Sequence, residues 1–397
     1  MRRTILFLYT AKNRTSINAL LGALASATSL WQRIQPVLCT HEGEALNVLS
    51  TTSGACLVCF SSMTYDRKER QDFLRNLPDN PNLFFCGGGP HVTVAPEDFA
   101  LPRTVLVQGE GEEVLLSLVV RFIEGTWTPG VIQATKVDIE RFPSFPYHLG
   151  FLGPIEISRG CPFGCAYCQT PVLFGKMIRH RSVDSIVEHV RGMMRFRERV
   201  DVRFVAPNAL AYGSQDGIQP NLAAVETLLG TLRKLLGKRG RIFFGSFPSE
   251  VRPEFVSDEA LAILQKTVDN RTLVIGAQSG SRRLLQRMRR GHTPEDVLSA
   301  CETMKRWGFR AIVDIIFGCP EETEEDFLET FHFMEKLITL GATIRAHTFL
   351  PLPGTPWGGK KPNPIPPWGK KLLSSLAREG KLKGQWQTQE AMLNERK

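Results

Sequence analysis

The sequence predicts an α/β protein with an N-terminal flavodoxin-like or Rossmann-like domain followed by a partial (β/α)6 barrel. Its 397 residues exceed what one hydrophobic core usually supports, which predicts two domains. Short apolar runs alternate with helical patterns in two separate series. Between the series, a segment rich in proline and aromatic residues predicts a linker. The expected parts are residues 1–125, a linker at 126–152, a barrel at 153–357 and a short basic tail at 358–397.

The first series contains five short runs rich in Val, Leu and Phe, which is typical of strands buried on both faces. These strands are expected at residues 4–9, 36–39, 55–60, 83–88 and 104–109. Helical patterns occupy residues 16–31 and 65–77 between them. Strand–helix alternation predicts a parallel sheet covered by helices, with ligands at the carboxyl ends of its strands.

The second series predicts six βα units. Its strands are expected at residues 154–158, 202–206, 241–246, 272–276, 311–317 and 343–350. Its helices are expected at residues 182–197, 222–236, 258–265, 294–307 and 324–340. Thr293 and Thr323 stand at capping positions before two of these helices. A partial barrel and an open doubly wound sheet both fit this pattern.

Composition is that of an ordinary soluble globular protein, with 42% hydrophobic and 22% charged residues. The net charge of +9 favours anionic partners such as phosphates or nucleic acid. No run reaches the roughly 18 apolar residues of a membrane helix. The N-terminal apolar run is short and is followed by Lys12 and Arg14, so we interpret it as a strand and expect a cytoplasmic protein.

Three of the nine cysteines are clustered, at Cys161, Cys165 and Cys168. The other six lie mostly inside apolar runs, where a free cysteine acts as a small hydrophobic residue. These are Cys39, Cys56, Cys59, Cys86, Cys301 and Cys319.

A CxxxCxxC pattern places three thiolates on one short loop. Three thiolates can bind three irons of a [4Fe–4S] cluster and leave the fourth iron open. A zinc site is the alternative, but structural zinc takes four ligands, and only His180 or a distant cysteine could supply the fourth.

The segment SRGCPFGCAYC, residues 158–168, resembles the signature loop of the radical S-adenosylmethionine (SAM) superfamily. Three later segments resemble the methylthiotransferases and their relatives within that superfamily, at residues 277–293, 314–323 and 349–356. The resemblance implies that the three cysteines are the metal ligands of a [4Fe–4S] cluster whose open iron is chelated by SAM.

The same resemblance implies a set of SAM-binding residues. The candidates are Tyr167, Asn208, Ser249, Glu250, Gln278, Ser279, Arg290 and Gly318. Many family members carry Gly-Gly-Glu after the second barrel strand, where this chain has Ala206-Pro207-Asn208, so Asn208 is expected to take that place. Arg290 is expected to balance the SAM carboxylate.

Glycine-rich turns follow the strands of the N-terminal series and resemble the cobalamin-binding domain joined to many radical SAM proteins. The candidate cobalamin contacts are Ser61, Ser62, Gly87, Gly88, Gly89, His91, Gly109 and Glu110. The Asp-x-His-x-x-Gly motif of proteins that place a histidine below the cobalt is missing, so we interpret His91 as a loop residue rather than a cobalt ligand.

Three functions are compatible with these features. The first is a cobalamin-associated radical SAM enzyme that transfers methyl to an unactivated carbon and takes electrons from a donor such as ferredoxin or flavodoxin. In it, one SAM supplies the methyl group and another supplies the radical. The second is methylthiotransferase-like modification of RNA or protein, which requires a second cluster on N-terminal cysteines. The third is a metal-stabilised nucleic-acid-binding protein, suggested by basic residues at 282–290. The sequence identifies neither the substrate nor the catalytic side chains beyond the cluster ligands.

Overall fold

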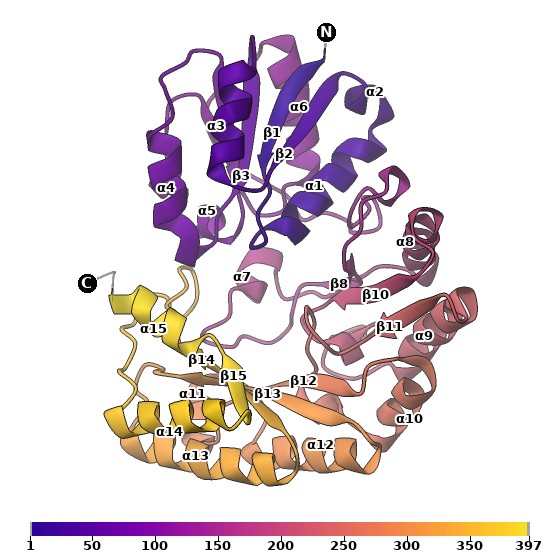
Figure 1. Ribbon diagram of the computed structural model, residues 1–397, viewed down its shortest axis with the longest axis vertical. Coiled ribbons are helices and arrows are strands. Elements are labelled where there is room, and N and C mark those ends of the chain that lie inside the picture. The colour runs from indigo at the N-terminus through magenta and orange to yellow at the C-terminus, as the bar shows by residue number, and fades with distance from the viewer. Residues whose placement is uncertain (1, 395–397) are drawn as a thin grey trace. The chain divides into compact units, whose positions relative to one another are not determined.

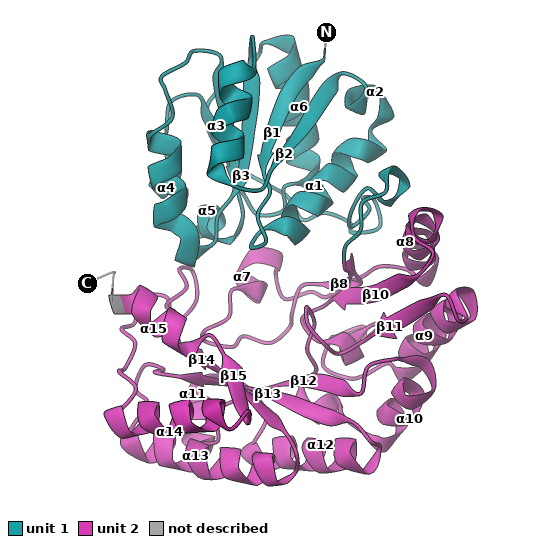
Figure 2. Ribbon diagram, viewed as in Figure 1, with its two compact units in different colours: residues 1–153 teal, residues 154–397 magenta. Residues whose placement is uncertain are grey.

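The computed structural model describes residues 2–394. The chain divides into two compact units, unit 1 at residues 1–153 and unit 2 at residues 154–397 (Figure 2). None of the helices within the described range has the length and apolar character that a membrane crossing requires.

Unit 1 is a six-stranded parallel sheet with the strand order β2-β1-β3-β4-β5-β6. The strands are β1 (Arg3–Leu8), β2 (Ile34–Cys39), β3 (Cys56–Ser61), β4 (Leu83–Gly88), β5 (Thr104–Gln108) and β6 (Gly130–Gln133). The first five strands have the flavodoxin-like order 2-1-3-4-5. In this order the chain adds β2 on one side of β1 and the later strands on the other side, so the switch point lies between β1 and β3. The predicted flavodoxin-like architecture is therefore confirmed.

Helices cover both faces of this sheet, because its strands bury side chains on alternate sides. The helices are α1 (Arg14–Ser26), α2 (Thr28–Trp31), α3 (Glu42–Thr51), α4 (Arg67–Arg75), α5 (Pro90–Val94) and α6 (Glu112–Glu124). Short 3-10 turns are η1 (Thr64–Asp66), η2 (Pro96–Phe99) and η3 (Tyr147–Leu149). One core packs α1 and α6 against the sheet, and the other packs α3, α4 and α5 against the opposite face (Figure 1).

Two details of unit 1 differ from expectation. The helix expected at 16–31 is interrupted at Ala27, which caps α1 by donating its N–H to the Leu24 carbonyl. The expected linker contains β6, which pairs in parallel with β5. β6 is a short edge strand with an exposed Val131, so its sequence lacks the signal of a buried strand.

Unit 2 contains seven parallel strands that form a partial barrel. Its strands are β7 (Ile155–Glu156), β10 (Val200–Val205), β11 (Gly240–Phe243), β12 (Thr272–Gln278), β13 (Arg310–Phe317), β14 (Thr343–Thr348) and β15 (Leu382–Gly384). The orders β7-β10-β11 and β12-β13-β14-β15 are joined by a parallel bridge between Val251 and Ile275. The bridge joins the two sheets into one curved series of strands. This series contains the six expected strands and one additional strand, β15.

The helices of unit 2 are α7 (Thr170–Phe174), α8 (Val183–Phe196), α9 (Leu222–Leu236), α10 (Asp258–Thr267), α11 (Arg282–Arg287), α12 (Pro294–Arg306), α13 (Glu324–Thr339), α14 (Pro367–Arg378) and α15 (Trp386–Asn394). The longer ones, such as α8, α9, α12 and α13, lie on the outside of the curved series, whereas α7 does not (Figure 1). Short turns are η4 (Ala209–Ala211) and η5 (Pro253–Phe255). Thr293 and Thr323 form the expected capping boxes, each with an aspartate three residues later.

The expected basic tail forms part of unit 2. Within the described residues it forms α14, β15 and α15, and β15 pairs with β14. The Thr348 hydroxyl on β14 donates to the Trp386 carbonyl oxygen at 2.8 Å, which ties α15 to the barrel. A three-residue strand between two helices is too short for its pattern to be recognised in the sequence. Residues 395–397 of the expected tail lie outside the described residues.

Candidate functional site

The cysteine loop begins at a small hairpin. β8 (Ser158–Arg159) pairs antiparallel with β9 (Arg179–His180), so the intervening residues form a closed loop that carries the three cysteines. Gly160 has φ +92, and a Cβ there would collide with the Met177 carbonyl oxygen. Glycine is therefore required where the chain leaves β8. The Cys161 N–H donates to the Gly175 carbonyl at 3.1 Å, which folds the loop back on itself.

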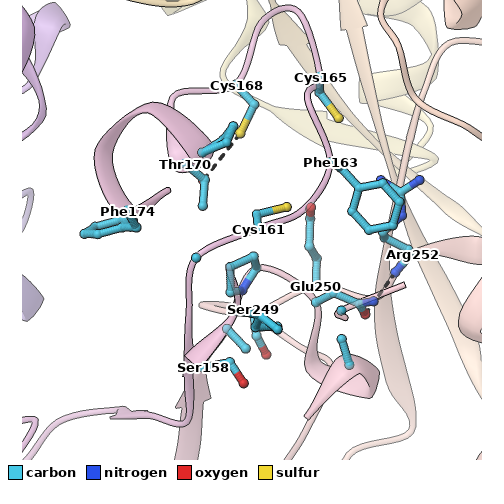
Figure 3. A pocket seen from close by; sticks show the side chains of 18 of the residues that line it. Ser158, Cys161, Phe163, Cys165, Cys168, Thr170, Phe174, Ser249, Glu250 and Arg252 are labelled. Carbon is cyan, nitrogen blue, oxygen red and sulfur yellow. Dashed lines mark hydrogen bonds between the residues drawn. The ribbon is translucent and has the colours of Figure 1, made fainter. Parts of the chain in front are cut away.

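The three thiols line one cavity of about 440 Å³ (Figure 3). Cys165 is buried, while Cys161 and Cys168 are partly exposed to the cavity. Burial raises the pKa of Cys161 to about 11 and also raises the pKa of Cys168. Binding of a metal by these thiols is therefore coupled to proton release.

The geometry favours a cluster over a single metal ion. Among the described residues, no group of three or more His, Cys, Asp or Glu side chains is arranged to hold one ion. His180, the expected fourth zinc ligand, has both ring nitrogens occupied: Nδ1 by the Ser158 hydroxyl and Nε2 by the Ser214 carbonyl, both at 2.8 Å. A cube-shaped cluster differs because each thiolate binds a different iron, so the sulfurs need not converge on one point.

Six of the eight candidate SAM contacts line the same cavity, namely Tyr167, Asn208, Ser249, Glu250, Gln278 and Arg290. The other two do not line it. Ser279 is buried and its hydroxyl pairs with that of Thr330 at 3.1 Å. Gly318 accepts a hydrogen bond from the Asn363 N–H, and its φ of +74 marks a tight turn. Both residues therefore shape the ends of β12 and β13 rather than the cavity wall.

Arg290 contacts a cysteine directly. Its Nη1 donates to Cys165 Sγ at 3.5 Å, and its Nη2 donates to the Gly276 carbonyl oxygen. The side chain is 4% exposed. Burial lowers the pKa of Arg290, but Tyr167, Cys165 and Glu250 together raise it above its ordinary value. The expected role of Arg290 as partner of the SAM carboxylate therefore competes with a contact to a cluster ligand.

Two polar side chains that line the cavity, those of Asn208 and Glu250, are candidates to bind a ligand. Asn208 accepts the Arg252 N–H with its Oδ1 at 3.4 Å, but its buried Nδ2 has no hydrogen-bond partner. Glu250 points its carboxylate into the cavity (Figure 3). Burial raises the pKa of Glu250, and the Arg290 charge lowers it in part. Buried polar groups are normally satisfied, so these positions are suited to a polar ligand.

Gly276 on β12 has no side chain, and this leaves room for the side chains of Glu250, Gln278 and Arg290 to approach one another. A Cβ at Gly276 would lie 2.9 Å from Gln278 Nε2, 3.1 Å from Arg290 Nη2 and 3.3 Å from Glu250 Oε1. Gln278 follows a bulge and has φ +77, a conformation that non-glycine residues rarely adopt. The strained backbone therefore directs the Gln278 amide to the cavity.

Three arginines that line the cavity were not among the candidates, namely Arg159, Arg252 and Arg345. Arg252 lies over the Phe163 ring at 3.5 Å and donates to the Arg290 carbonyl oxygen, so it joins the cysteine loop to Arg290. Arg345 on β14 lines the cavity and donates from Nε to Asp314 Oδ1 at 2.5 Å. An aspartate inside the apolar strand VDIIF was a signal, because a buried charge is normally paired. The position of Arg252 carries no comparable signal.

The candidate cobalamin contacts all lie at or just after the carboxyl ends of β3, β4 and β5. Gly89 and Gly109 adopt φ +94 and +99, so both turns need glycine. Gly87 leaves room for the Phe60 ring, and Gly88 pairs with β3.

The polar side chains of this set are committed to protein partners. The Ser61 hydroxyl accepts from Ser16 at 3.5 Å, and Ser62 donates to Asp66 at 3.0 Å. His91 pairs through Nε2 with Asp98 at 2.7 Å and through Nδ1 with Thr64 at 3.2 Å. Glu110 accepts the Val137 N–H at 3.1 Å.

Comparison with known proteins identifies the barrel. The family model of the radical SAM superfamily matches residues 155–334, which include the cysteine loop and strands β7 and β10 to β13. Residues 155–334 form a radical SAM domain. A radical SAM domain implies a [4Fe–4S] cluster and SAM, and the donor set of the cavity fits both groups.

Curated relatives match between half and three quarters of this chain. An uncharacterised methyltransferase of Pyrococcus horikoshii is 26% identical over 323 residues, 74% of this chain and 66% of that protein. A tRNA-2-methylthio-N(6)-dimethylallyladenosine synthase of Finegoldia magna is 32% identical over 204 residues, 51% of this chain and 42% of that protein. The chain thus spans less than two thirds of the length of these relatives.

Solved structures resemble the fold of this chain. The cobalamin-dependent SAM radical enzyme OxsB matches with a TM-score of 0.65 at 16% identity, over 84% of this chain and 52% of that chain. The radical SAM methyltransferase TsrM from Kitasatospora setae matches with a TM-score of 0.62 at 18% identity, over 90% and 74%. At these identities the likeness establishes the fold, a flavodoxin-like domain followed by a radical SAM barrel.

Proposed function

We propose that this protein is a radical SAM enzyme that transfers a methyl group to an unactivated carbon, with cobalamin held by unit 1. One observation carries the first part of the proposal. Three cysteine thiols share a cavity with Arg290 on one thiol and with polar groups that have no protein partner. Such a cavity suits a cluster together with a polar ligand.

Different residues of the cavity would bind the cluster and SAM. Cys161, Cys165 and Cys168 would hold the cluster. The Asn208 amide offers donors to the SAM carboxylate, and the Glu250 carboxylate offers acceptors to the ribose hydroxyls. When bound, the cluster and SAM together supply a 5′-deoxyadenosyl radical, which abstracts hydrogen from the substrate.

The walls of the cavity keep water away from this chemistry. Tyr167 lines the cavity and packs against an apolar cluster behind the wall that includes Met288 and Phe349. Other apolar parts of the wall are Pro162, Phe163 and Phe174. A water-poor site protects a reactive radical from side reactions.

Unit 1 would hold cobalamin mainly through backbone groups. The turns at Gly89 and Gly109 bring main chain to the carboxyl edge of the sheet, where ligands of such folds bind. His91 has both ring nitrogens engaged and is buried, so we infer an open lower cobalt face or a ligand other than His91. When bound, cobalamin would carry the methyl group that is transferred.

Methylthiotransferase-like chemistry is less well supported, although relatives with that name exist. It requires three N-terminal cysteines that hold a second cluster. Here Cys59 and Cys86 lie in the core on one face of the sheet, while Cys39 and Cys56 lie in the core on the other. Two thiols on each face cannot supply three ligands to one cluster.

The test follows both fates of SAM in one sample. Protein purified and reconstituted without oxygen, supplied with cobalamin and reduced with dithionite, is given SAM labelled at the methyl carbon. We expect 5′-deoxyadenosine, S-adenosylhomocysteine, labelled bound cobalamin and about four irons per chain. Absence of 5′-deoxyadenosine would refute radical chemistry, absence of bound cobalamin would refute the role of unit 1, and about eight irons would favour the methylthiotransferase-like function.

A further inference from the structure

A second pocket of about 310 Å³ lies on the surface of unit 2, on the other side of the cysteine loop from the main cavity. The basic pocket, as we call it, is lined by Ala166, Arg287, Arg289, Glu321, Trp357 and Lys360, among others. The two cavities have no lining residue in common. The basic pocket is therefore a separate feature that the SAM site does not explain.

The wall of the basic pocket is part of the cluster-binding loop. Ala166 is covalently bonded to Cys165, and its carbonyl oxygen accepts the Trp357 N–H at 3.0 Å. The Ala166 N–H donates to the Met288 carbonyl at 2.9 Å, which fixes the loop to the segment that carries Arg289. Ala166, Met288 and Trp357 belong to one buried apolar cluster. Covalent and hydrogen bonds through this apolar cluster therefore connect the basic pocket to Cys165, one of the proposed cluster ligands.

The rim of the basic pocket is positively charged. Three cations, Arg287, Arg289 and Lys360, face one carboxylate, that of Glu321. Glu321 pairs with Lys360 at 2.5 Å and with Arg287 at 3.4 Å. Arg289 is exposed and forms no ion pair with any described residue. The surplus of two positive charges suits an acidic partner.

The other arginines of this segment do not extend the patch. Arg282 is paired with Glu295 at 2.7 Å, Arg283 is paired with Asp326, and Arg290 is buried at the main cavity. Trp357 is 6% exposed and cannot stack on a base. A strand of RNA would need a longer basic track with stacking aromatics. A small, localised charge beside a redox centre is more typical of weak electron-transfer contacts, which use small interfaces.

We propose that the basic pocket is the docking site of a small, acidic one-electron carrier protein that contains a flavin or an iron–sulfur centre. This inference rests on the proposed function, which consumes an electron from outside the chain. At docking the carrier is oxidised by one electron and the [4Fe–4S] cluster is reduced by one electron. No covalent bond forms or breaks in this step.

The experiment compares two reductants on the full chain with its cluster reconstituted. The rate of cluster reduction is followed by loss of visible absorbance after mixing with reduced flavodoxin or with dithionite. The test variant is Arg287→Glu with Arg289→Glu. The matched control is Lys238→Glu with Arg239→Glu, which makes the same charge change at two exposed residues between α9 and β11.

We expect the test variant to be reduced by flavodoxin about tenfold more slowly than the wild type, because long-range steering is lost. The control variant and the dithionite rates should not change. The wild-type rate with flavodoxin should fall with added salt. Because Arg289 has φ +57, Arg289→Asn with Arg287→Gln is a second, milder variant that suits this backbone and should show a smaller slowing.

Two outcomes would overturn the docking proposal. These are an unchanged flavodoxin rate in both variants and equal slowing with both reductants. Failure of the proposed function would look different. In that case the wild type reduced with dithionite would not cleave SAM, whatever the flavodoxin rate.

Discussion

Arg290 Nη1 lies 3.5 Å from Cys165 Sγ and donates a hydrogen bond to it. The Arg290 side chain is buried. The Arg290 backbone carbonyl accepts a hydrogen bond from Arg252, and the Arg252 guanidinium stacks on the Phe163 ring of the cysteine loop. A fixed cation therefore lies beside one ligand of the proposed cluster. The sequence predicts a partner for SAM at this position, and the contact with Cys165 predicts a second role, that of tuning the reduction potential of the cluster.

Replacing Arg290 with Gln is expected to lower the reduction potential of the cluster. Reduction adds negative charge, which a neighbouring cation and a hydrogen bond to sulfur stabilise. A charged hydrogen bond worth about 1.5 kcal/mol corresponds to roughly 60 mV for one electron. An EPR-monitored redox titration measures the shift, with Arg287→Gln as a control outside the cavity. An unchanged or higher potential in Arg290→Gln would contradict this role.

Each of the three loop cysteines is expected to be essential for the cluster. Changing Cys161, Cys165 or Cys168 to Ala should reduce the iron content from about four per chain to nearly none, because three thiolates hold the cube. Cys301→Ala is the matched control, since Cys301 is buried in α12 and contacts no metal site. Iron and sulfide analysis after anaerobic reconstitution gives the answer. Full iron in a loop variant would rule out that cysteine as a ligand.

Asn208→Ala is expected to weaken SAM binding about tenfold, since a hydrogen bond to a charged group contributes about 1.5–3 kcal/mol. The reason is the buried Nδ2, which has no protein partner. Asn208→Asp keeps the acceptor that the Arg252 N–H uses but removes the donor, so it should weaken SAM binding at least as much. Calorimetry on the reconstituted protein measures both. Unchanged affinity in both variants would show that Asn208 does not bind SAM.

Gly89→Ala is expected to destabilise unit 1 by about 2 kcal/mol or more. The residue has φ +94, and an added Cβ would press on Ser61 and on the backbone of Ser62. Gly54→Ala is a matched control with φ +114 and open space, so it should show only the backbone cost of about 1 kcal/mol. Urea unfolding followed by circular dichroism separates the two. An equal loss of unfolding free energy in the two variants would show that the close packing at Gly89 does not contribute to stability.

Acid is expected to destabilise unit 2 through His189. Burial lowers the pKa of His189 to about 4 from 6.5, so the folded protein keeps it neutral while the unfolded chain binds a proton. Stability is therefore complete above pH 6.5 and falls as the pH drops toward 4, by about 3 kcal/mol at most. His189→Gln should flatten this part of the stability–pH curve. A curve of unchanged slope in the variant would assign the acid sensitivity to other groups.

The sequence was most informative where the pattern is long and buried. β3 has a continuous apolar run, the run of β13 is interrupted only by Asp314, and all five helices expected in the barrel are present. It failed at β6 and β15, which are short edge strands whose few residues carry little burial signal. The hairpin β8–β9 was also missed, because only two residues pair on each side.

In the candidate site, too, residues with a local sequence signal were predicted and residues placed by tertiary contacts were not. The cavity-lining cysteines were predicted from local spacing, and most of the candidate SAM-binding residues that line the same cavity were predicted from motifs at strand ends. Arg252 and Arg345 were not, because each acts on a residue distant in sequence, Phe163 and Asp314 respectively. Ser279 and Gly318 belong to motifs, yet they support the strand ends instead of lining the cavity. Motifs thus located the site, and tertiary contacts decided which side chains face it.

The central claim is that Cys161, Cys165 and Cys168 hold a four-iron cluster with one iron open to SAM. The most direct measurement is electron–nuclear double resonance on the dithionite-reduced protein mixed with SAM that carries ¹⁵N in its amino group. The account predicts a ¹⁵N coupling to the cluster that is replaced by a ¹⁴N coupling when unlabelled SAM is exchanged in. A reduced cluster without nitrogen coupling, or bound zinc in place of iron, would contradict it.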